Sequence, residues 1–235
     1  MSQQPQHRRV GGIDLIEISV GPEAPTIMLL HGYGADCTDL VPLAAHLSVG
    51  KPINWIFPNG PQTVEIGPHV SGRAWFPISI SELEKSGGAN AFAEAQPPGM
   101  KRSRELIFNV LQELAVSPAR LVLGGFSQGA MLATDVALRM PNGPAGLAIL
   151  SGTCVNAGEW LRLAGAKKGF RQFQCHGKQD PVLGISGARE LDGLFKQAGW
   201  TGRLLEFDGG HEIPLPALSQ LNQYLRQTIA MLPKV

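Results

Sequence analysis

Cysteine is scarce in this sequence, and its pattern argues against two classes of protein. The 235 residues include only three cysteines, Cys37, Cys154 and Cys175, which are widely spaced and odd in number. A disulfide framework is therefore not expected, and such usage is typical of reduced thiols in the cytoplasm. No Cys-x-x-Cys pair is present, which argues against a structural zinc site. We accordingly expect a cytoplasmic protein without a bound metal.

Net charge and long apolar runs are also lacking. Twenty Lys and Arg residues face 19 Asp and Glu residues, which gives a formal net charge of +1 at pH 7. This balance offers no electrostatic reason to expect binding to nucleic acid or to a charged membrane. No apolar stretch approaches the length that crosses a bilayer, and residues 1–9 are polar, unlike a signal peptide. We expect neither a nucleic-acid partner nor integral membrane association.

The sequence does contain an alternation of apolar, strand-like segments with amphipathic, helix-like segments. It predicts strands over residues 13–20, 26–30, 54–57, 121–126, 146–150, 170–175 and 202–207. It predicts helices over residues 36–49, 98–117, 127–140, 159–163, 186–198 and 216–232. Strands separated by helices indicate parallel strands with right-handed crossovers. The predicted fold class is therefore α/β, a doubly wound and mostly parallel sheet in a single domain, with its site at the carboxyl ends of the strands.

Two stretches of the sequence lack this alternation. Residues 1–12 are polar and are predicted to form an N-terminal tail ahead of a domain that spans residues 13–235. Residues 61–97 show little periodicity and much Gly, Ser and Pro, and a segment of this length is usually functional or mobile. We expect it to form a cap or insert loop beside the site, with Trp75 and Phe76 binding the substrate. Alternatively, these aromatic side chains only anchor the loop to the domain.

The segment Gly125-Phe126-Ser127-Gln128-Gly129 lies between a predicted strand and a predicted helix. That is the context of a Gly-x-Ser-x-Gly nucleophile elbow, a sharp turn that exposes the serine hydroxyl above the sheet. Glycine suits the flanking positions because side chains there would meet the neighbouring strand and helix. The Gln128 N–H at the helix start is placed to stabilise an oxyanion. A Gly-rich turn with Ser127 as the N-cap is the alternative, but the context favours Ser127 as a nucleophile.

A nucleophilic serine needs a base and an orienting acid, which follow it in the order Asp or Glu, then His, in α/β-hydrolases. His211 and Asp180 each follow a predicted strand and occur in this order, so they are the predicted base and acid. His176 also ends a strand, but it precedes the acid. Asp208 is an alternative acid, although it lies only three residues before His211 on the same loop.

The loop after the second strand contains a candidate for the other half of an oxyanion hole. It reads His31-Gly32-Tyr33-Gly34, and its two glycines let the backbone turn so that an N–H points at the site. We predict that the Tyr33 N–H is this donor and that it acts together with the Gln128 N–H. A tight turn without a catalytic role is the alternative.

These segments together resemble the phospholipase/carboxylesterase family of α/β-hydrolases, which includes small bacterial carboxylesterases and acyl-protein thioesterases. The resemblance begins near Thr26, runs to the C-terminus, and rests on residues 29–34, 73–76, 125–130, 176–181 and 210–214. It implies a small single-domain serine hydrolase that cleaves small-molecule esters or thioesters without a cofactor. The family's triad falls on Ser127, Asp180 and His211, and its oxyanion donors fall on Tyr33 and Gln128.

The sequence departs from the family pattern at a few positions and leaves several points open. Tyr33 stands where many members carry leucine, and Pro77 stands where many carry aspartate, so the acyl pocket and the cap can differ. A peptidase or lactonase could use the same triad, and a binding protein could use the same scaffold. The lack of a large substrate-selecting domain argues against a peptidase, and the intact triad argues against a binding protein. Acyl length and oligomeric state, a homodimer included, stay open.

Overall fold

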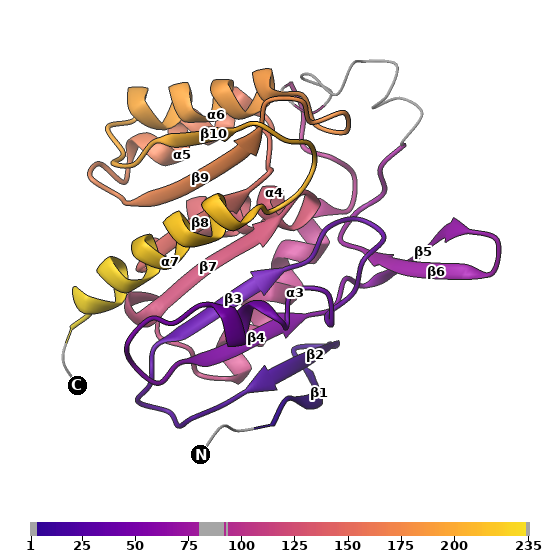
Figure 1. Ribbon diagram of the computed structural model, residues 1–235, viewed down its shortest axis with the longest axis vertical. Coiled ribbons are helices and arrows are strands. Elements are labelled where there is room, and N and C mark those ends of the chain that lie inside the picture. Colours follow the sequence, from indigo (N-terminus) through magenta and orange to yellow (C-terminus); the bar gives the residue numbers. More distant parts are fainter. Residues whose placement is uncertain (1–3, 80–91, 93, 234–235) are drawn as a thin grey trace.

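A computed structural model describes residues 4–79, 92 and 94–233 and shows an eight-stranded sheet with helices on both of its faces (Figure 1). The strands of this sheet are β1 (Gln6–Val10), β2 (Ile13–Ile18), β3 (Thr26–Leu30), β4 (Asn54–Pro58), β7 (Leu121–Phe126), β8 (Gly146–Leu150), β9 (Gln172–Gly177) and β10 (Leu204–Phe207). A separate hairpin consists of β5 (Gln62–Gly67) and β6 (Val70–Ala74). The helices are α1 (Leu43–His46), α3 (Met100–Glu113), α4 (Gln128–Arg139), α5 (Ala157–Gly165), α6 (Ile185–Gln197) and α7 (Leu215–Ala230), with a 3₁₀ turn at Pro118–Arg120.

The main sheet is mostly parallel, as predicted. Its strand order is β1-β2-β4-β3-β7-β8-β9-β10, and only the β1–β2 and β2–β4 pairs are antiparallel. Every residue of β3 and β8 is buried, as expected for strands covered on both faces. The parallel strands end at one edge of the sheet (Figure 1), so the loops that follow them lie together there.

Helices on the two faces of the sheet form two apolar cores. On one face, α3, α4, α5 and α6 pack together, and on the other face α7 and the segment around α1 pack on the sheet. In Figure 1, α7 crosses in front of the strands. Residues 128–138 of α4 are all buried. This burial fixes the start of α4 against the sheet and therefore fixes the position of Ser127.

The N-terminal residues correct the expectation of a polar tail over residues 1–12. Residues Gln6–Val10 form β1, an edge strand that pairs antiparallel with β2. Four of its five residues are exposed, so the strand lacks the apolar pattern from which it could have been predicted. Gly11 and Gly12, with φ of 60° and 89°, make the turn between the two strands.

The helix predicted over residues 36–49 is also wrong in extent, because only Leu43–His46 is helical. Asp36 Oδ1 accepts hydrogen bonds from the N–H and the hydroxyl of Thr38, at 2.8 and 2.6 Å. Such local side-chain bonds compete with a helix, and the chain continues as i→i+3 turns instead. Pro42 supplies no N–H and delays the helix until the next residue.

The aperiodic segment over residues 61–97 contains regular structure that the sequence did not indicate. Strands β5 and β6 pair antiparallel and project beyond the edge at which the parallel strands end (Figure 1). Residues 80–91 and 93 of the predicted cap lie outside the described residues. The hairpin was missed because its strands pair with each other and most of their residues are partly or fully exposed, so they lack a clear apolar alternation.

Candidate active site

Ser127 lies at a sharp turn between β7 and α4, as predicted. Its backbone torsions, φ +54° and ψ −119°, are sparsely populated by non-glycine residues and persist only where the surrounding structure holds them. A Cβ on Gly125 would lie 2.5 Å from the carbonyl carbon of Gly129, and a Cβ on Gly129 would lie 2.1 Å from Leu30 O. These distances give the steric reason for both glycines of the Gly-x-Ser-x-Gly motif.

Asp180 and His211 are in direct contact, with 2.6 Å between Asp180 Oδ2 and His211 Nδ1. The Asp180 side chain is completely buried, and Oδ1 accepts hydrogen bonds from the N–H groups of Val182 (2.8 Å) and Leu183 (2.9 Å). Burial alone would raise the pKa of Asp180. Hydrogen bonds from His176, His211 and Leu183 outweigh burial and hold this pKa well below its usual range. Asp180 is thus an ionised acceptor that orients the His211 ring.

The structure distinguishes the two candidate histidines. The His176 side chain has no exposed surface, whereas that of His211 is 17% exposed. The His211 ring packs on Phe126, the residue before Ser127, with 4.8 Å between ring centroids. A base must reach the nucleophile and the leaving group, so access and position favour His211. The alternative acid, Asp208, forms an ion pair with a surface lysine.

The loop after β3 lies against the nucleophile elbow. A Cβ on Gly32 would lie 3.4 Å from the Cβ of Ser127, so the backbone beside Tyr33 passes close to the nucleophile. Gln128 is the first residue of α4, and the first N–H groups of a helix have no partner within it. The structure therefore brings the two backbone segments that carry the predicted oxyanion donors close to Ser127.

The β5–β6 hairpin holds this loop in place. The Gly34 N–H donates to Arg73 O (2.9 Å), and the Arg73 N–H donates to Ala35 O (2.8 Å). A Cβ on Gly72 would lie 1.9 Å from Gly34 O, so only glycine permits this close approach of the two backbones. The hairpin is therefore part of the scaffold of the site, a role that the aperiodic sequence of the segment did not reveal.

His31 supports the same loop from the interior. Its Nδ1 lies 2.7 Å from Gly32 O, and the Gly60 N–H donates to Nε2 at 2.9 Å. Because Nε2 accepts a hydrogen bond, the ring proton lies on Nδ1 and the ring is neutral. Burial lowers the pKa of His31 to about 4, although the hydrogen bond to Gly32 acts in the opposite direction.

Trp75 and Phe76 are completely buried, and this corrects the expectation that they face the substrate. The Trp75 N–H donates to Gln128 Oε1 (2.8 Å), and Gln128 Nε2 donates to Phe76 O (2.7 Å). The Trp75 indole N–H donates to His31 O (2.9 Å). A buried tryptophan contributes a large apolar contact area, and its indole N–H usually has a hydrogen-bond partner, as it has here. Trp75 thus anchors the hairpin segment to both the loop after β3 and the residue after Ser127.

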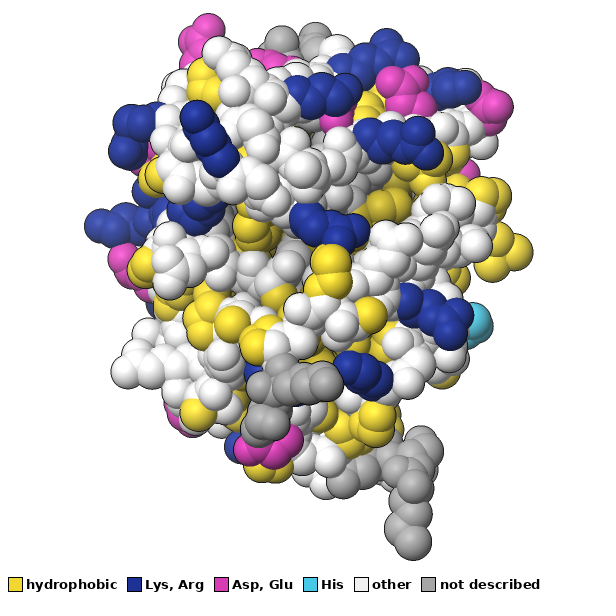
Figure 2. Space-filling view, turned by 90° about the vertical axis from the view of Figure 1, so that its left-hand side faces the viewer, with side chains coloured by type: hydrophobic (Ala, Val, Ile, Leu, Met, Phe, Trp, Pro, Cys, Tyr) yellow, Lys and Arg dark blue, Asp and Glu magenta, His cyan; other side chains and the backbone are white. Residues whose placement is uncertain are grey.

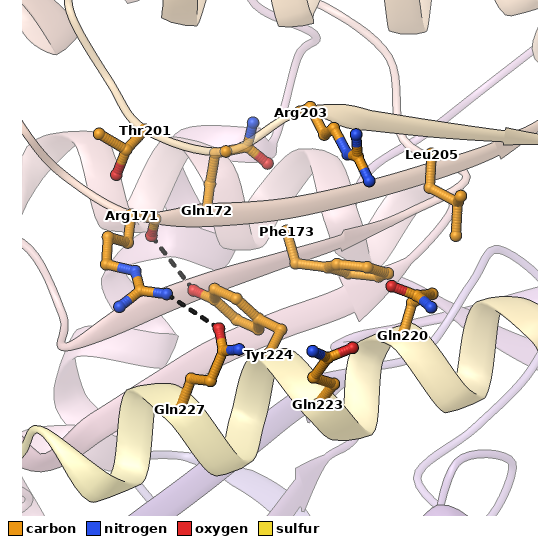
Figure 3. Close-up of a pocket in the computed structure, with 11 residues that line it drawn as sticks. Arg171, Gln172, Phe173, Thr201, Arg203, Leu205, Gln220, Gln223, Tyr224 and Gln227 are labelled. Atoms are coloured by element: carbon orange, nitrogen blue, oxygen red, sulfur yellow. Dashed lines mark hydrogen bonds between the residues drawn. The ribbon is translucent and has the colours of Figure 1, made fainter.

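A groove of about 450 Å³ lies away from these residues, between α7 and the starts of β9 and β10 (Figure 3). Its lining includes Arg171, Arg203 and Tyr224, and the Tyr224 hydroxyl donates to Arg171 O at 3.1 Å. Figure 2 shows the side of the molecule at which the parallel strands begin, with Lys and Arg side chains spread across it. Since Asp180 follows the opposite end of β9, the groove does not belong to the site around Ser127.

The part of the chain that the structure describes contains no helix long and apolar enough to cross a membrane. It also contains no group of three or more His, Cys, Asp and Glu side chains that could hold a metal ion. All three cysteines are buried free thiols.

The mostly parallel sheet, the strained serine between a strand and a helix, and the acid and histidine on later strand-end loops define an α/β-hydrolase. The chain belongs to the phospholipase/carboxylesterase family, whose model matches residues 12–229. It is therefore a serine hydrolase of carboxylic esters or thioesters, as the sequence predicted.

Curated relatives and solved structures agree with this assignment. The acyl-protein thioesterase 1 of Saccharomyces cerevisiae is 31% identical over 182 residues, 72% of this chain and 76% of the relative. That of Kluyveromyces lactis is 29% identical over 185 residues, 75% and 78% of the two chains. The crystal structure of esterase PE8 covers 97% of this chain and 100% of its own, with a TM-score of 0.73 at 22% identity. That of Zea mays acyl-protein thioesterase 2 covers 92% and 98%, with a TM-score of 0.67 at 24% identity. The structural likenesses confirm the predicted fold.

Proposed function

We propose that the protein cleaves its ester or thioester substrates through an acyl-enzyme on Ser127, with His211 as the base and Asp180 as the orienting acid. The observation that carries the proposal is the 2.6 Å contact of His211 Nδ1 with Asp180 Oδ2. The His211 ring also packs against Phe126, the residue before the strained Ser127. With Nδ1–H directed at the carboxylate, the unprotonated Nε2 can accept the serine proton.

The acylation step begins when His211 removes the Ser127 proton and Oγ attacks the substrate carbonyl carbon. The bond to the leaving oxygen or sulfur then breaks, and His211 gives its proton to the departing alcohol or thiol. Water next attacks the acyl-enzyme and gives one proton to His211, which returns it to Ser127 as the carboxylic acid leaves. Asp180 stabilises the His211 imidazolium in both halves of the cycle.

The N–H groups of Tyr33 and Gln128 are proposed to stabilise the negative charge on the carbonyl oxygen in the transition state. The close approach of the Tyr33 loop to Ser127 and the position of Gln128 at the start of α4 support this role. Each such donor contributes on the order of 3 kcal/mol to transition-state stabilisation. The Gln128 side chain, bonded to Trp75 and Phe76, helps to keep its own backbone in position.

The names of the curated relatives favour acyl thioesters among the proposed substrates. A peptidase or a lactonase could use the same three residues, so the bond has to be tested directly. We also propose that the protein acts in the cytoplasm, because its three cysteines are buried free thiols.

A substrate panel tests the proposal. It contains p-nitrophenyl esters from acetate to palmitate, a palmitoyl thioester, a lactone and a peptide. We expect turnover of the esters or of the thioester, unchanged by a chelator, and little turnover of the other two. Preferred cleavage of the lactone or the peptide would identify one of the alternative activities. No turnover of any substrate would contradict the proposal.

A further inference from the structure

Two imidazole rings share one oxygen of the catalytic acid. His176 Nε2 lies 3.2 Å from Asp180 Oδ2, the same oxygen that His211 Nδ1 contacts at 2.6 Å. His176 Nε2 also lies 2.7 Å from Leu183 O. His176 stands near the end of β9, and its side chain is completely buried. The second histidine is therefore a permanent part of the Asp180 environment and has no access to a substrate.

The neighbouring atoms place the His176 proton on Nε2. Both atoms near Nε2, Leu183 O and Asp180 Oδ2, are acceptors, so this nitrogen carries the hydrogen. Nδ1 is buried and has no hydrogen-bond partner among the described residues. A second proton there would bury an unpaired N–H together with a positive charge, which is costly. The geometry therefore describes a neutral ring that donates from Nε2.

The other charged groups near His176 and Asp180 have partners of their own. Glu206 lies opposite His176 in the β9–β10 register and accepts two hydrogen bonds from Arg189, at 2.8 and 2.7 Å. On the exposed side, Lys178 pairs with Asp208 at 2.9 Å. Glu212, the residue after His211, has its carboxylate 3.4 Å from the Gly210 N–H. The Asp180 carboxylate accepts hydrogen bonds from His211, Val182 and Leu183. The His176 Nε2–H is directed at Leu183 O and also lies beside Asp180 Oδ2, at the longer distance of 3.2 Å.

We infer that His176 is a positioning residue for the acid–base pair, because its Nε2–H, which Leu183 O and Asp180 Oδ2 share, fixes Oδ2 beside His211 and stabilises the negative charge on that oxygen. The inference rests on the proposed function of Asp180 and His211. Without this donor, the carboxylate would carry more charge toward His211 and would stabilise the imidazolium more strongly. His211 would then take up a proton at higher pH, and activity would be lost earlier as the pH is lowered.

The substitutions His176→Gln and His176→Met form a matched pair. The glutamine amide can place an N–H near the position of Nε2, whereas methionine has a similar length and no donor. For His176→Met we expect kcat to fall about tenfold, the effect of losing one hydrogen bond to a charged group, with little change in KM. The acidic limb of the pH profile, where kcat/KM falls as the pH is lowered, should move to higher pH by about half a unit or more. His176→Gln should keep the limb in place and retain most of kcat.

Gln174→Met is the control for a general loss of packing. Gln174 is buried on the same strand, two residues before His176, and its Nε2 donates to Ala188 O at 2.8 Å. Its substitution removes a buried hydrogen bond without touching Asp180, so the acidic limb should not move. If His176→Met fails to fold, His176→Asn takes its place, because the shorter amide does not reach the position of Nε2.

Titration of the His211 ring by NMR, without substrate, separates this inference from the proposed function. In His176→Met, His211 should protonate at higher pH than in the wild type, and in His176→Gln at the same pH. Equal titration in all three proteins, or an equal shift in Gln174→Met, would overturn the positioning role. A shift confined to the variant without a donor would support it, even if the wild type turned over no ester or thioester.

Discussion

At the scale of single residues, the sequence predicted those roles that depend on neighbours in the chain. The strand before Ser127 and the helix after it predict a sharp turn at this residue, and the structure has that turn. The order of Asp180 and His211 on later loops predicts that they pair, and the structure brings them into contact. Roles that depend on distant partners could not be predicted. Trp75 pairs with Gln128 and with His31, 53 and 44 residues away, and no local pattern shows such pairs.

Ser127 and His211 should act as one unit in kinetics. Ser127→Ala and His211→Ala should each lower kcat by a similar and large factor, and the double variant should lose little more, since each single change already removes the shared step. Circular dichroism should show that both variants stay folded. Losses that multiply in the double variant would mean that the two side chains serve separate steps.

His31 should make stability depend on pH below the ordinary imidazole range. Burial lowers the pKa of His31 from 6.5 to about 4, so in this window the unfolded chain binds a proton that the folded protein does not. The free energy of unfolding should therefore decrease as the pH falls from 6.5 to about 4, by up to roughly 3 kcal/mol.

Urea unfolding of the wild type and of His31→Gln at several pH values measures this dependence. The glutamine variant should be less stable near neutral pH but should show a flatter pH profile, because it lacks the titrating ring. Asp180 interferes little with the test, since its lowered pKa gives a contribution that is lost mainly as the pH falls below 3.8, at the lower end of the His31 range. An unchanged slope in His31→Gln would rule out His31 as its cause.

At the scale of elements, burial decided what could be predicted. Strands β3, β7 and β8 are apolar runs buried in the sheet, and their predicted bounds agree with the structure. Strand β1 and the β5–β6 hairpin are mostly exposed or partly exposed and pair at edges, so their sequences carry no comparable signal. The hairpin nevertheless contacts the loop beside the nucleophile, which makes it part of the site's scaffold.

Gly72→Ala should impair catalysis by displacing the loop after β3, which carries Tyr33. Its Cβ would lie 1.9 Å from Gly34 O, so the hairpin and the loop would have to move apart. A displacement of about 1 Å at such a site can cost up to about 100-fold in kcat. Gly67→Ala in the same hairpin is the matched control, because its Cβ would meet nothing within 4 Å. Equal activity of Gly72→Ala and Gly67→Ala would show that the hairpin does not position the loop beside Ser127.

Trp75→Ala should reduce stability and leave the preference for ester chain length unchanged. The ring is fully buried and donates to His31 O, and truncation of a buried tryptophan costs roughly 3–5 kcal/mol. Trp75→Phe, which keeps a ring and loses only the donor, should have a smaller effect. Thermal unfolding and the p-nitrophenyl ester series measure both properties. A stable Trp75→Ala variant with an altered chain-length profile would restore the substrate-binding role.

At the scale of the whole molecule, the mostly parallel sheet places the carboxyl ends of β3, β7, β9 and β10 at one edge. The segments that follow these four strands contain, in the same order, Tyr33, Ser127, Asp180 and His211. The order of strands and helices could be predicted from periodicity. The hairpin contacts and the second histidine at Asp180 could not, because they depend on the packing of segments far apart in sequence or on the exact course of a loop.

Covalent labelling by a fluorophosphonate tests the central claim, that Ser127 is the nucleophile activated by the Asp180–His211 pair. The native protein should gain one phosphonyl group, and peptide mass spectrometry should place it on Ser127. Ser127→Ala should remain unlabelled, and His211→Ala should react far more slowly. Labelling of another residue in the wild type, or undiminished labelling of Ser127→Ala, would contradict the account.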